Sequence, residues 1–231
     1  MSITNRARAT GAMVKLTRTG GVLDYGPDHS RLLLRVVRTL VHGRPVSADQ
    51  VEQLIAELGL SRDDAHAFLG RVSERGPDEE IVGIVPGLSL NQTPHRFTIS
   101  GRRLFTWCAA DTLVLPALLG RPASIESDSP TSTTTIRLTV SPQRVEAVDP
   151  ATAVVSMVVV DPDAADMSSV EALWGTFCHH IFFFAARQEA ERWAAGRYNK
   201  HAIEIVSVDE AFELGQLVSS TLLTQAGGRH G

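Results

Sequence analysis

The sequence predicts an α+β protein of 231 residues, in which a winged-helix-like domain precedes a mixed α/β core. Three observations support this organisation. Residues 25–100 carry three apolar runs at helical spacing followed by two β-prone runs, whereas residues 101–231 mix helical and β-branched segments. Residues 1–24 are polar or small and show no period, so we expect a flexible N-terminal arm there.

The first domain should contain three short helices. Apolar side chains recur at helical spacing in residues 28–42. The second helix should begin at Ser47, which stands three residues before Gln50 in the pattern of a capping box, and should end at Gly59. Ser61 is placed to cap the third.

Two β-prone runs, residues 81–85 and 96–100, complete the order that is typical of a winged helix. The core should open with a helix at residues 107–119, and a break rich in proline, serine, threonine and aspartate covers residues 121–132. The remaining strands are expected at residues 134–140, 144–148, 153–160, 178–185 and 202–206, and the remaining helices at residues 188–195 and from Ser207 or Asp209 to about Leu223.

Composition argues against several classes of function. The formal net charge is -4, and residues 61–75, which would form the DNA-reading helix, balance three arginines with three acids, so nucleic acid is not an expected partner. A secreted chain of this size would more often carry several disulfides than two cysteines, so we expect a cytoplasmic protein. No segment has the apolar length of a signal peptide or a membrane span, so no membrane association is expected.

Cys108 and Asp111 could act on one atom. They stand three residues apart at the start of the predicted helix 107–119, which places both side chains on one face. The positive end of the helix dipole favours the thiolate form of Cys108, and thiolates bind soft metals. The structural alternative is common: free cysteines are usually buried and inert, and a carboxylate in a first turn often only complements the dipole.

Cys178 is the other cysteine of the chain. If its predicted strand packed against the Cys108 helix, two thiols and a carboxylate would form a site suited to a soft divalent cation. The neighbouring His179 and His180 raise the question of zinc, but adjacent strand residues face opposite sides and no CxxC or HxxxH partner occurs. The GxSxG, GxxxxGK[ST] and GxGxxG motifs are also missing, which leaves hydrolase and nucleotide chemistry unsupported.

Three segments carry a specific family resemblance. Residues 103–121 (RLFTWCAADTLVLPALLGR), 177–185 (FCHHIFFFA) and 205–216 (IVSVDEAFELGQ) resemble the corresponding segments of organomercurial lyases, also called alkylmercury lyases. The resemblance runs from about Leu32 to Leu223. It implies that the winged-helix part has become structural and that residues 101–231 form the α/β catalytic core specific to this family.

The resemblance also implies a chemistry. It suggests an enzyme that needs no external cofactor and cleaves a carbon–mercury bond by protonolysis, with Cys108, Asp111 and Cys178 as its catalytic and mercury-binding residues. The substrate would be an organomercurial small molecule, and solvent thiols or a mercuric reductase would accept the Hg²⁺. Common members carry further cysteines that this sequence lacks, and His179 stands where one would follow Cys178. A winged-helix regulator that responds to mercury and a non-catalytic soft-metal-binding protein remain as alternatives.

Overall fold

The computed structural model describes residues 2–159, 165–195 and 202–227 and has the mixed α and β fold that was predicted. Its helices are α1 (Ser2–Thr17), α2 (Gly26–Leu40), α3 (Ala48–Leu58), α4 (Arg62–Val72), α5 (Ala109–Leu119), α6 (Val170–Thr176), the 3-10 helix η2 (Cys178–His180), α7 (Arg187–Ala195) and α8 (Val208–Gly227). Its strands are β1 (Ser73–Arg75), β2 (Ile81–Ile84), β3 (Leu88–Ser89), β4 (His95–Ile99), β5 (Arg102–Thr106), β6 (Ala123–Asp128), β7 (Thr135–Val140), β8 (Val145–Asp149), β9 (Val154–Val159), β10 (Phe183–Phe184) and β11 (Ala202–Ser207).

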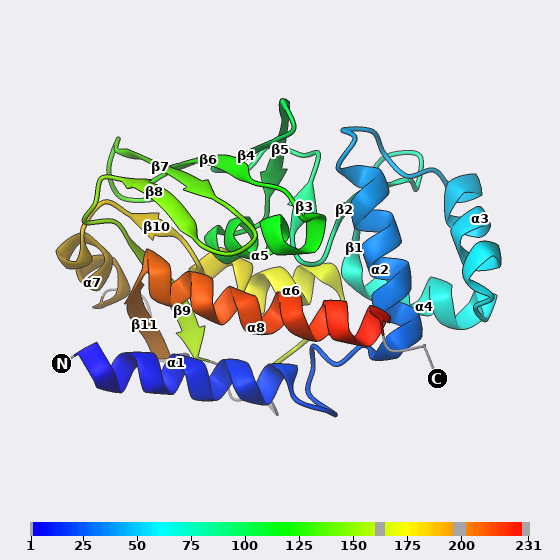
Figure 1. Cartoon of the computed structure of the whole chain (residues 1–231), viewed down its shortest axis with the longest axis horizontal. Coiled ribbons are helices and arrows are strands. Elements are labelled where there is room, and N and C mark those ends of the chain that lie inside the picture. The colour runs from blue at the N-terminus through cyan, green and yellow to red at the C-terminus, as the bar shows by residue number, and fades with distance from the viewer. Residues whose placement is uncertain (1, 160–164, 196–201, 228–231) are drawn as a thin grey trace.

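The strands form two antiparallel sheets. The larger has the order β1-β2-β3-β5-β4-β6-β7-β8 and the smaller the order β10-β9-β11. The C-terminal helix α8 contacts α5, α2 and α1, and so joins the N-terminal helices to the core (Figure 1). Gly215 lets α8 approach α5 closely, because a Cβ at this position would lie 3.2 Å from a methyl group of Val114.

The three helices predicted within residues 25–100 are confirmed as α2, α3 and α4, and the antiparallel pair β1 and β2 follows them. The predicted capping box of α3 is present: the Gln50 backbone N–H donates to Ser47 Oγ at 3.3 Å, and the Ser47 N–H donates to Gln50 Oε1 at 2.9 Å. The expected domain boundary between residues 100 and 101 falls in the turn between β4 and β5, so the sheet continues across it. The assignment of residues 25–100 to a winged-helix-like domain stays a prediction.

Residues 2–17, which lie within the expected N-terminal arm, form the helix α1. This helix buries Ala12 and Leu16 and contacts α8 and the smaller sheet. Arg8 also forms an ion pair of 3.0 Å with the buried carboxylate of Glu204 on β11. The buried stripe of α1 consists mostly of small side chains, which give a weak periodic signal, and its partner surface is assembled only by folding.

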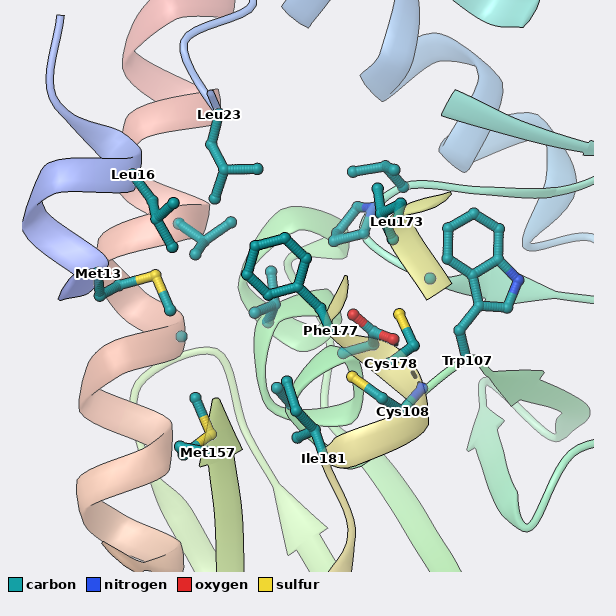
Figure 2. Close-up of a pocket in the computed structure, with 18 of the residues that line it drawn as sticks. Met13, Leu16, Leu23, Trp107, Cys108, Met157, Leu173, Phe177, Cys178 and Ile181 are labelled. Atoms are coloured by element: carbon teal, nitrogen blue, oxygen red, sulfur yellow. Dashed lines mark hydrogen bonds between the residues drawn. The ribbon is translucent and has the colours of Figure 1, made fainter. Parts of the chain in front are cut away.

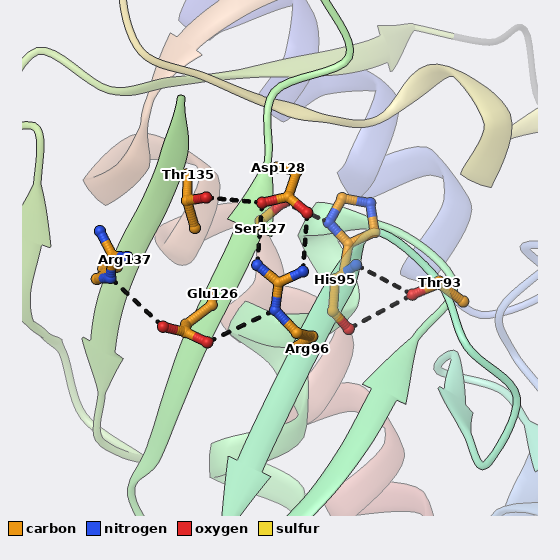
Figure 3. A network of polar contacts seen from close by, with 8 residues as sticks. All are labelled: Thr93, His95, Arg96, Glu126, Ser127, Asp128, Thr135 and Arg137. Atoms are coloured by element: carbon orange, nitrogen blue, oxygen red, sulfur yellow. Dashed lines mark hydrogen bonds and ion pairs between the residues drawn. The ribbon is translucent and has the colours of Figure 1, made fainter. Parts of the chain in front are cut away.

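The expected break at residues 121–132 contains a central strand, β6, which pairs with β4 and β7. Its inward side chains alternate and include Ile125 and Ser127, both buried. Its polar outer side chains are held by charge: the Arg96 guanidinium of β4 donates to both carboxylate oxygens of Asp128, at 2.8 and 2.9 Å (Figure 3). Cross-strand pairing therefore outweighs a composition typical of loops.

The strand predicted at residues 178–185 is also wrong over most of its length. Cys178–His180 form the 3-10 helix η2, and only Phe183–Phe184 pair with β9. The preceding helix α6 was not predicted; the Ser169 hydroxyl caps it by accepting the Ala172 backbone N–H at 3.2 Å. A run of aromatic residues indicates burial but does not distinguish a strand from a tight turn.

Candidate active site

The start of α5 fixes the positions of Cys108 and Asp111. Cys108 precedes the helix with an extended backbone, and the Thr106 hydroxyl of β5 donates to its carbonyl oxygen at 3.0 Å. Asp111 occupies the third helical position, from which its carboxylate accepts the Cys108 backbone N–H at 2.8 Å. This is a capping box in which cysteine replaces the usual serine or threonine, so the Cys-x-x-Asp spacing positions both side chains at once.

The segment after η2 holds Cys178 beside this helix start. The carbonyl oxygen of Ile181 accepts the backbone N–H of Ala109 at 3.1 Å. The two cysteine sulfurs and a carboxylate oxygen of Asp111 all lie within 4.8 Å of one another. Figure 2 shows Cys108 and Cys178 side by side. One ion could contact all three, because two metal–sulfur bonds of about 2.3 Å, the length found in zinc thiolates, span about 4.6 Å. Within the described ranges, no other cluster of three or more potential metal ligands of this kind is found.

Burial governs the acidity of Asp111. Desolvation raises the pKa of this carboxyl group from its ordinary value of 3.8 to about 7, although hydrogen bonds from the Cys108 thiol and backbone N–H act in the opposite direction. A carboxyl group with this pKa can both accept and deliver a proton near neutral pH.

Burial also raises the pKa of the Cys108 thiol well above its usual range, since Cys108 is only 2% exposed. The interaction with the neighbouring Cys108 thiol lowers the pKa of Cys178, but burial and the Asp111 charge outweigh it and leave that pKa raised. The backbone N–H of Asp111, at the start of α5, does lower the pKa of Cys108 as expected, but burial outweighs it. Removing water from the thiolate costs more than the partial charge at one helix end contributes.

An apolar cavity of about 110 Å³ adjoins the three side chains. In Figure 2, Met13, Leu16 and Leu23 lie across this cavity from the two cysteines. Three of the four methionines of the chain line the cavity: Met13, Met157 and Met167. Unbranched thioether side chains adapt to irregular shapes, so the cavity suits an organic group of variable form.

Gly87, which sequence reasoning did not single out, packs directly on the carboxylate of Asp111. A Cβ at this position would lie 2.0 Å from Asp111 Oδ2, and the backbone φ of +76° favours glycine. The Gly87 carbonyl oxygen also accepts the Trp107 backbone N–H at 2.8 Å. The Pro86-Gly87 pair marks a turn in the sequence, but nothing local indicates which side chain that turn covers.

The two histidines beside Cys178 do not join the cluster of potential metal ligands in the described part of the chain. The His180 ring hydrogen-bonds to the Gly175 carbonyl oxygen at 2.9 Å, and the exposed His179 ring packs near Trp174. A zinc site built on Cys178 and these histidines is therefore not supported.

Comparisons with known proteins agree on one family. A family model described as alkylmercury lyase matches residues 88–220. An alkylmercury lyase of Pseudomonas putida is 39% identical over 202 residues, covering 87% of this chain and 88% of the relative. One of Streptomyces lividans is 35% identical over 206 residues, with coverage of 89% and 88%. A crystal structure of the mercury-bound form of MerB2 has the same fold, with a TM-score of 0.72, 24% identity and coverage of 94% of this chain and 99% of that one. Because both lyases exceed 30% identity over most of either chain, this chain belongs to the alkylmercury lyase family.

Proposed function

We propose that the protein is an organomercurial lyase, which cleaves the carbon–mercury bond of alkyl- and arylmercury compounds to give a hydrocarbon and Hg²⁺. The observation that carries this proposal is the position of two thiols and a carboxyl group of pKa about 7 beside an apolar cavity. Sulfur ligands suit the soft metal, the apolar wall suits the organic group, and the carboxyl group can move a proton.

Capture begins at one of the two thiols, and we assign it to Cys178, because this leaves the Cys108 thiol and its proton beside the Asp111 carboxylate for the next step. The Cys178 sulfur forms a bond to the mercury of R–Hg–X, the bond from mercury to X breaks, and the thiol proton leaves with X. The organic group R then occupies the apolar cavity.

Cleavage uses the second thiol and Asp111. The Cys108 proton passes to the Asp111 carboxylate, and the Cys108 sulfur becomes the second ligand of mercury. Two sulfur ligands increase the electron density on the metal and weaken its bond to carbon, and Asp111 then delivers its proton to that carbon. The hydrocarbon R–H leaves, and Hg²⁺ remains on two thiolates.

The proposed sequence requires no external cofactor. One thiol proton ends on X and the other on carbon, and the carboxylate of Asp111 is regenerated. Hg²⁺ bound by two thiolates is a strong soft-metal complex, so we propose solvent thiols or a mercuric reductase as its acceptors.

We propose a cytoplasmic location, because both cysteines are free and a reducing compartment keeps them so. In the part of the chain that the structure describes, no helix is both long enough and apolar enough to cross a membrane.

For residues 25–100 we propose a winged-helix-like part with a structural role. Arg62 and His66 of α4 both contact the carboxylate of Glu52 on α3, at 3.0 and 2.7 Å. A DNA-reading helix instead needs an excess of cations free to contact phosphates. The catalytic residues all lie within residues 101–231.

The test of the proposed function is the release of hydrocarbon. Reduced protein is incubated with phenylmercury or methylmercury salt and excess thiol, and benzene or methane is measured in the headspace. We expect release by the wild-type protein and none by Cys108→Ser or Cys178→Ser. Tight mercury binding without hydrocarbon would indicate a binding protein, and a sequence-selective DNA complex released by mercury would indicate a regulator.

A further inference from the structure

A second cavity, of about 200 Å³, also reaches Cys178. Its walls include the polar side chains of Glu74, Asn91 and His179, and the last two are exposed. Cys178 and Trp107 line both this cavity and the apolar one. Cys178 therefore borders both an apolar cavity and a polar cavity whose lining includes exposed side chains.

Trp107 forms the wall between the two spaces. In Figure 2 it lies beside Cys178, on the side away from Met13. Its indole N–H donates to a Glu74 carboxylate oxygen at 3.0 Å, and its ring meets Trp174 edge to face at 5.5 Å between centroids. The Trp107 side chain is thus held in place by its N–H group and by the contact of its ring.

The polar cavity offers hydrogen-bonding groups to a small ligand. Asn91 Nδ2 and the Ser89 hydroxyl both donate to Glu74, at 2.6 and 2.8 Å, which fixes this carboxylate at the cavity wall. The exposed side chains of Asn91 and His179 line the same cavity and can donate hydrogen bonds to an acceptor. A ligand with both a cationic or donor group and an acceptor would be complementary to these walls.

We propose that this polar cavity binds the low-molecular-weight thiol that removes Hg²⁺ from the cysteine pair. The inference rests on the proposed function, because it assigns the exit of that reaction's product. Small biological thiols carry ammonium, hydroxyl, amide or carboxylate groups, which the apolar cavity could not hydrogen-bond. The chain has no third cysteine to relay the metal, so exchange must occur at the pair itself.

The exchange step balances without an oxidant or a reductant. The incoming sulfur forms a bond to mercury, the bond between mercury and Cys178 Sγ breaks, and the thiol proton moves to Cys178 Sγ. A second thiol replaces Cys108 in the same way and returns a proton to it. Mercury leaves as a complex of two small thiolates, and both protein thiols are restored.

The charge of the thiol gives the first test. Glu74 is an acidic residue at this cavity, and no lysine or arginine is among the described residues that line it. Reduced protein is loaded with one equivalent of Hg²⁺ and mixed with cysteamine, mercaptoethanol or mercaptoacetate, and the rate of mercury loss is followed. We expect cysteamine to act about threefold to tenfold faster than mercaptoacetate at equal thiolate concentration, and Glu74→Gln to remove most of that difference.

The size of the cavity gives the second test. Asn91→Trp should fill it and slow mercury loss to all three thiols by about tenfold or more. Gln53→Trp, which places the same bulk on the exposed face of α3, should leave the rates unchanged. Thermal melts of each variant check that it is folded.

The outcomes separate this inference from the proposed function. Loading with Hg²⁺ needs no cleavage of a carbon–mercury bond, so the exchange is measurable even if phenylmercury yields no benzene. Unchanged rates in folded Asn91→Trp, or a charge preference that persists in Glu74→Gln, would show that thiols reach mercury by another route. If Asn91→Trp does not fold, the charge preference and its loss in Glu74→Gln decide the question.

Discussion

Replacing Asp111 by asparagine should separate capture of an organomercurial from its cleavage. Asparagine has the same size, and its side-chain oxygen can still accept the Cys108 backbone N–H that Asp111 accepts at 2.8 Å. It cannot take a proton from a thiol or give one to carbon. We therefore expect binding to be retained and hydrocarbon release to fall by about 10²–10⁴-fold.

The stability of the folded protein provides an independent measure of the same residue. Folding raises the pKa of Asp111 from 3.8 to about 7, so the folded state holds the proton more tightly than the unfolded state. The stability that this proton contributes is present at acidic pH and is lost as the pH rises through about 7. A difference of about three pKa units corresponds to at most about 4 kcal/mol, so Asp111→Asn should be the more stable protein at about pH 8 by up to that amount.

If Asp111 only complemented the dipole of α5, its replacement by asparagine would lower the stability of the folded protein instead, by about 1 kcal/mol. Asp209→Asn is the matched control, because Asp209 is an exposed carboxylate in the first turn of α8. Single-turnover benzene release and urea unfolding at about pH 5 and pH 8 compare the two variants. A parental release rate in folded Asp111→Asn, with the same small loss of stability as Asp209→Asn, would refute the role of Asp111 in proton transfer.

Three further changes test other parts of the structure. Gly87→Ala places a methyl group against Asp111 and strains a positive φ, so we expect the stability to fall by about 1–3 kcal/mol. Single-turnover cleavage should fall while titrated Hg²⁺ binding persists, and an equal loss of cleavage and of Hg²⁺ binding would contradict this. Met13→Ala enlarges the apolar cavity and should raise kcat/KM for phenylmercury relative to methylmercury by about threefold or more. Val14→Ala, on the exposed side of the same helix, should not change that ratio, and an unchanged ratio in both variants would place the organic group elsewhere. Burial lowers the pKa of His95 to about 3, so the folded protein loses stability as the pH falls from about 6.5 towards 3. At pH 5 this loss is about 2 kcal/mol, and urea unfolding should show that His95→Asn removes it. An undiminished loss in the variant would show that other groups cause it.

Local signals in the sequence predicted the elements that local interactions define. The Ser47 and Gln50 spacing predicted α3 because the capping hydrogen bonds lie within four residues of chain. The helix α1 and the strand β6 could not be predicted in this way, since each is stabilised by partners distant in sequence: Glu204 and α8 for α1, β4 and β7 for β6. Strand and helix assignments fail where tertiary packing decides the conformation.

The same division holds within the site. The proximity of Cys108 and Asp111 follows from three residues of helix and was predictable. The approach of Cys178, 70 residues later, depends on the turn of η2 and on the backbone hydrogen bond from Ala109 to Ile181, neither of which has a sequence signature. The family resemblance supplied the pairing that spacing could not. It did not indicate the contact between Gly87 and Asp111.

The raised thiol pKa values fit the proposed reaction better than free thiolates would. Protonolysis of R–Hg–X consumes two protons, one for X and one for carbon, and two protonated cysteines hold that number. Burial keeps both protons in place until mercury arrives. A metal then deprotonates the thiol that it binds, so the proton is released only after the organomercurial, with its carbon–mercury bond, has entered the site. Asp111, with a pKa of about 7, can take that proton from sulfur and still be acidic enough to deliver it to carbon.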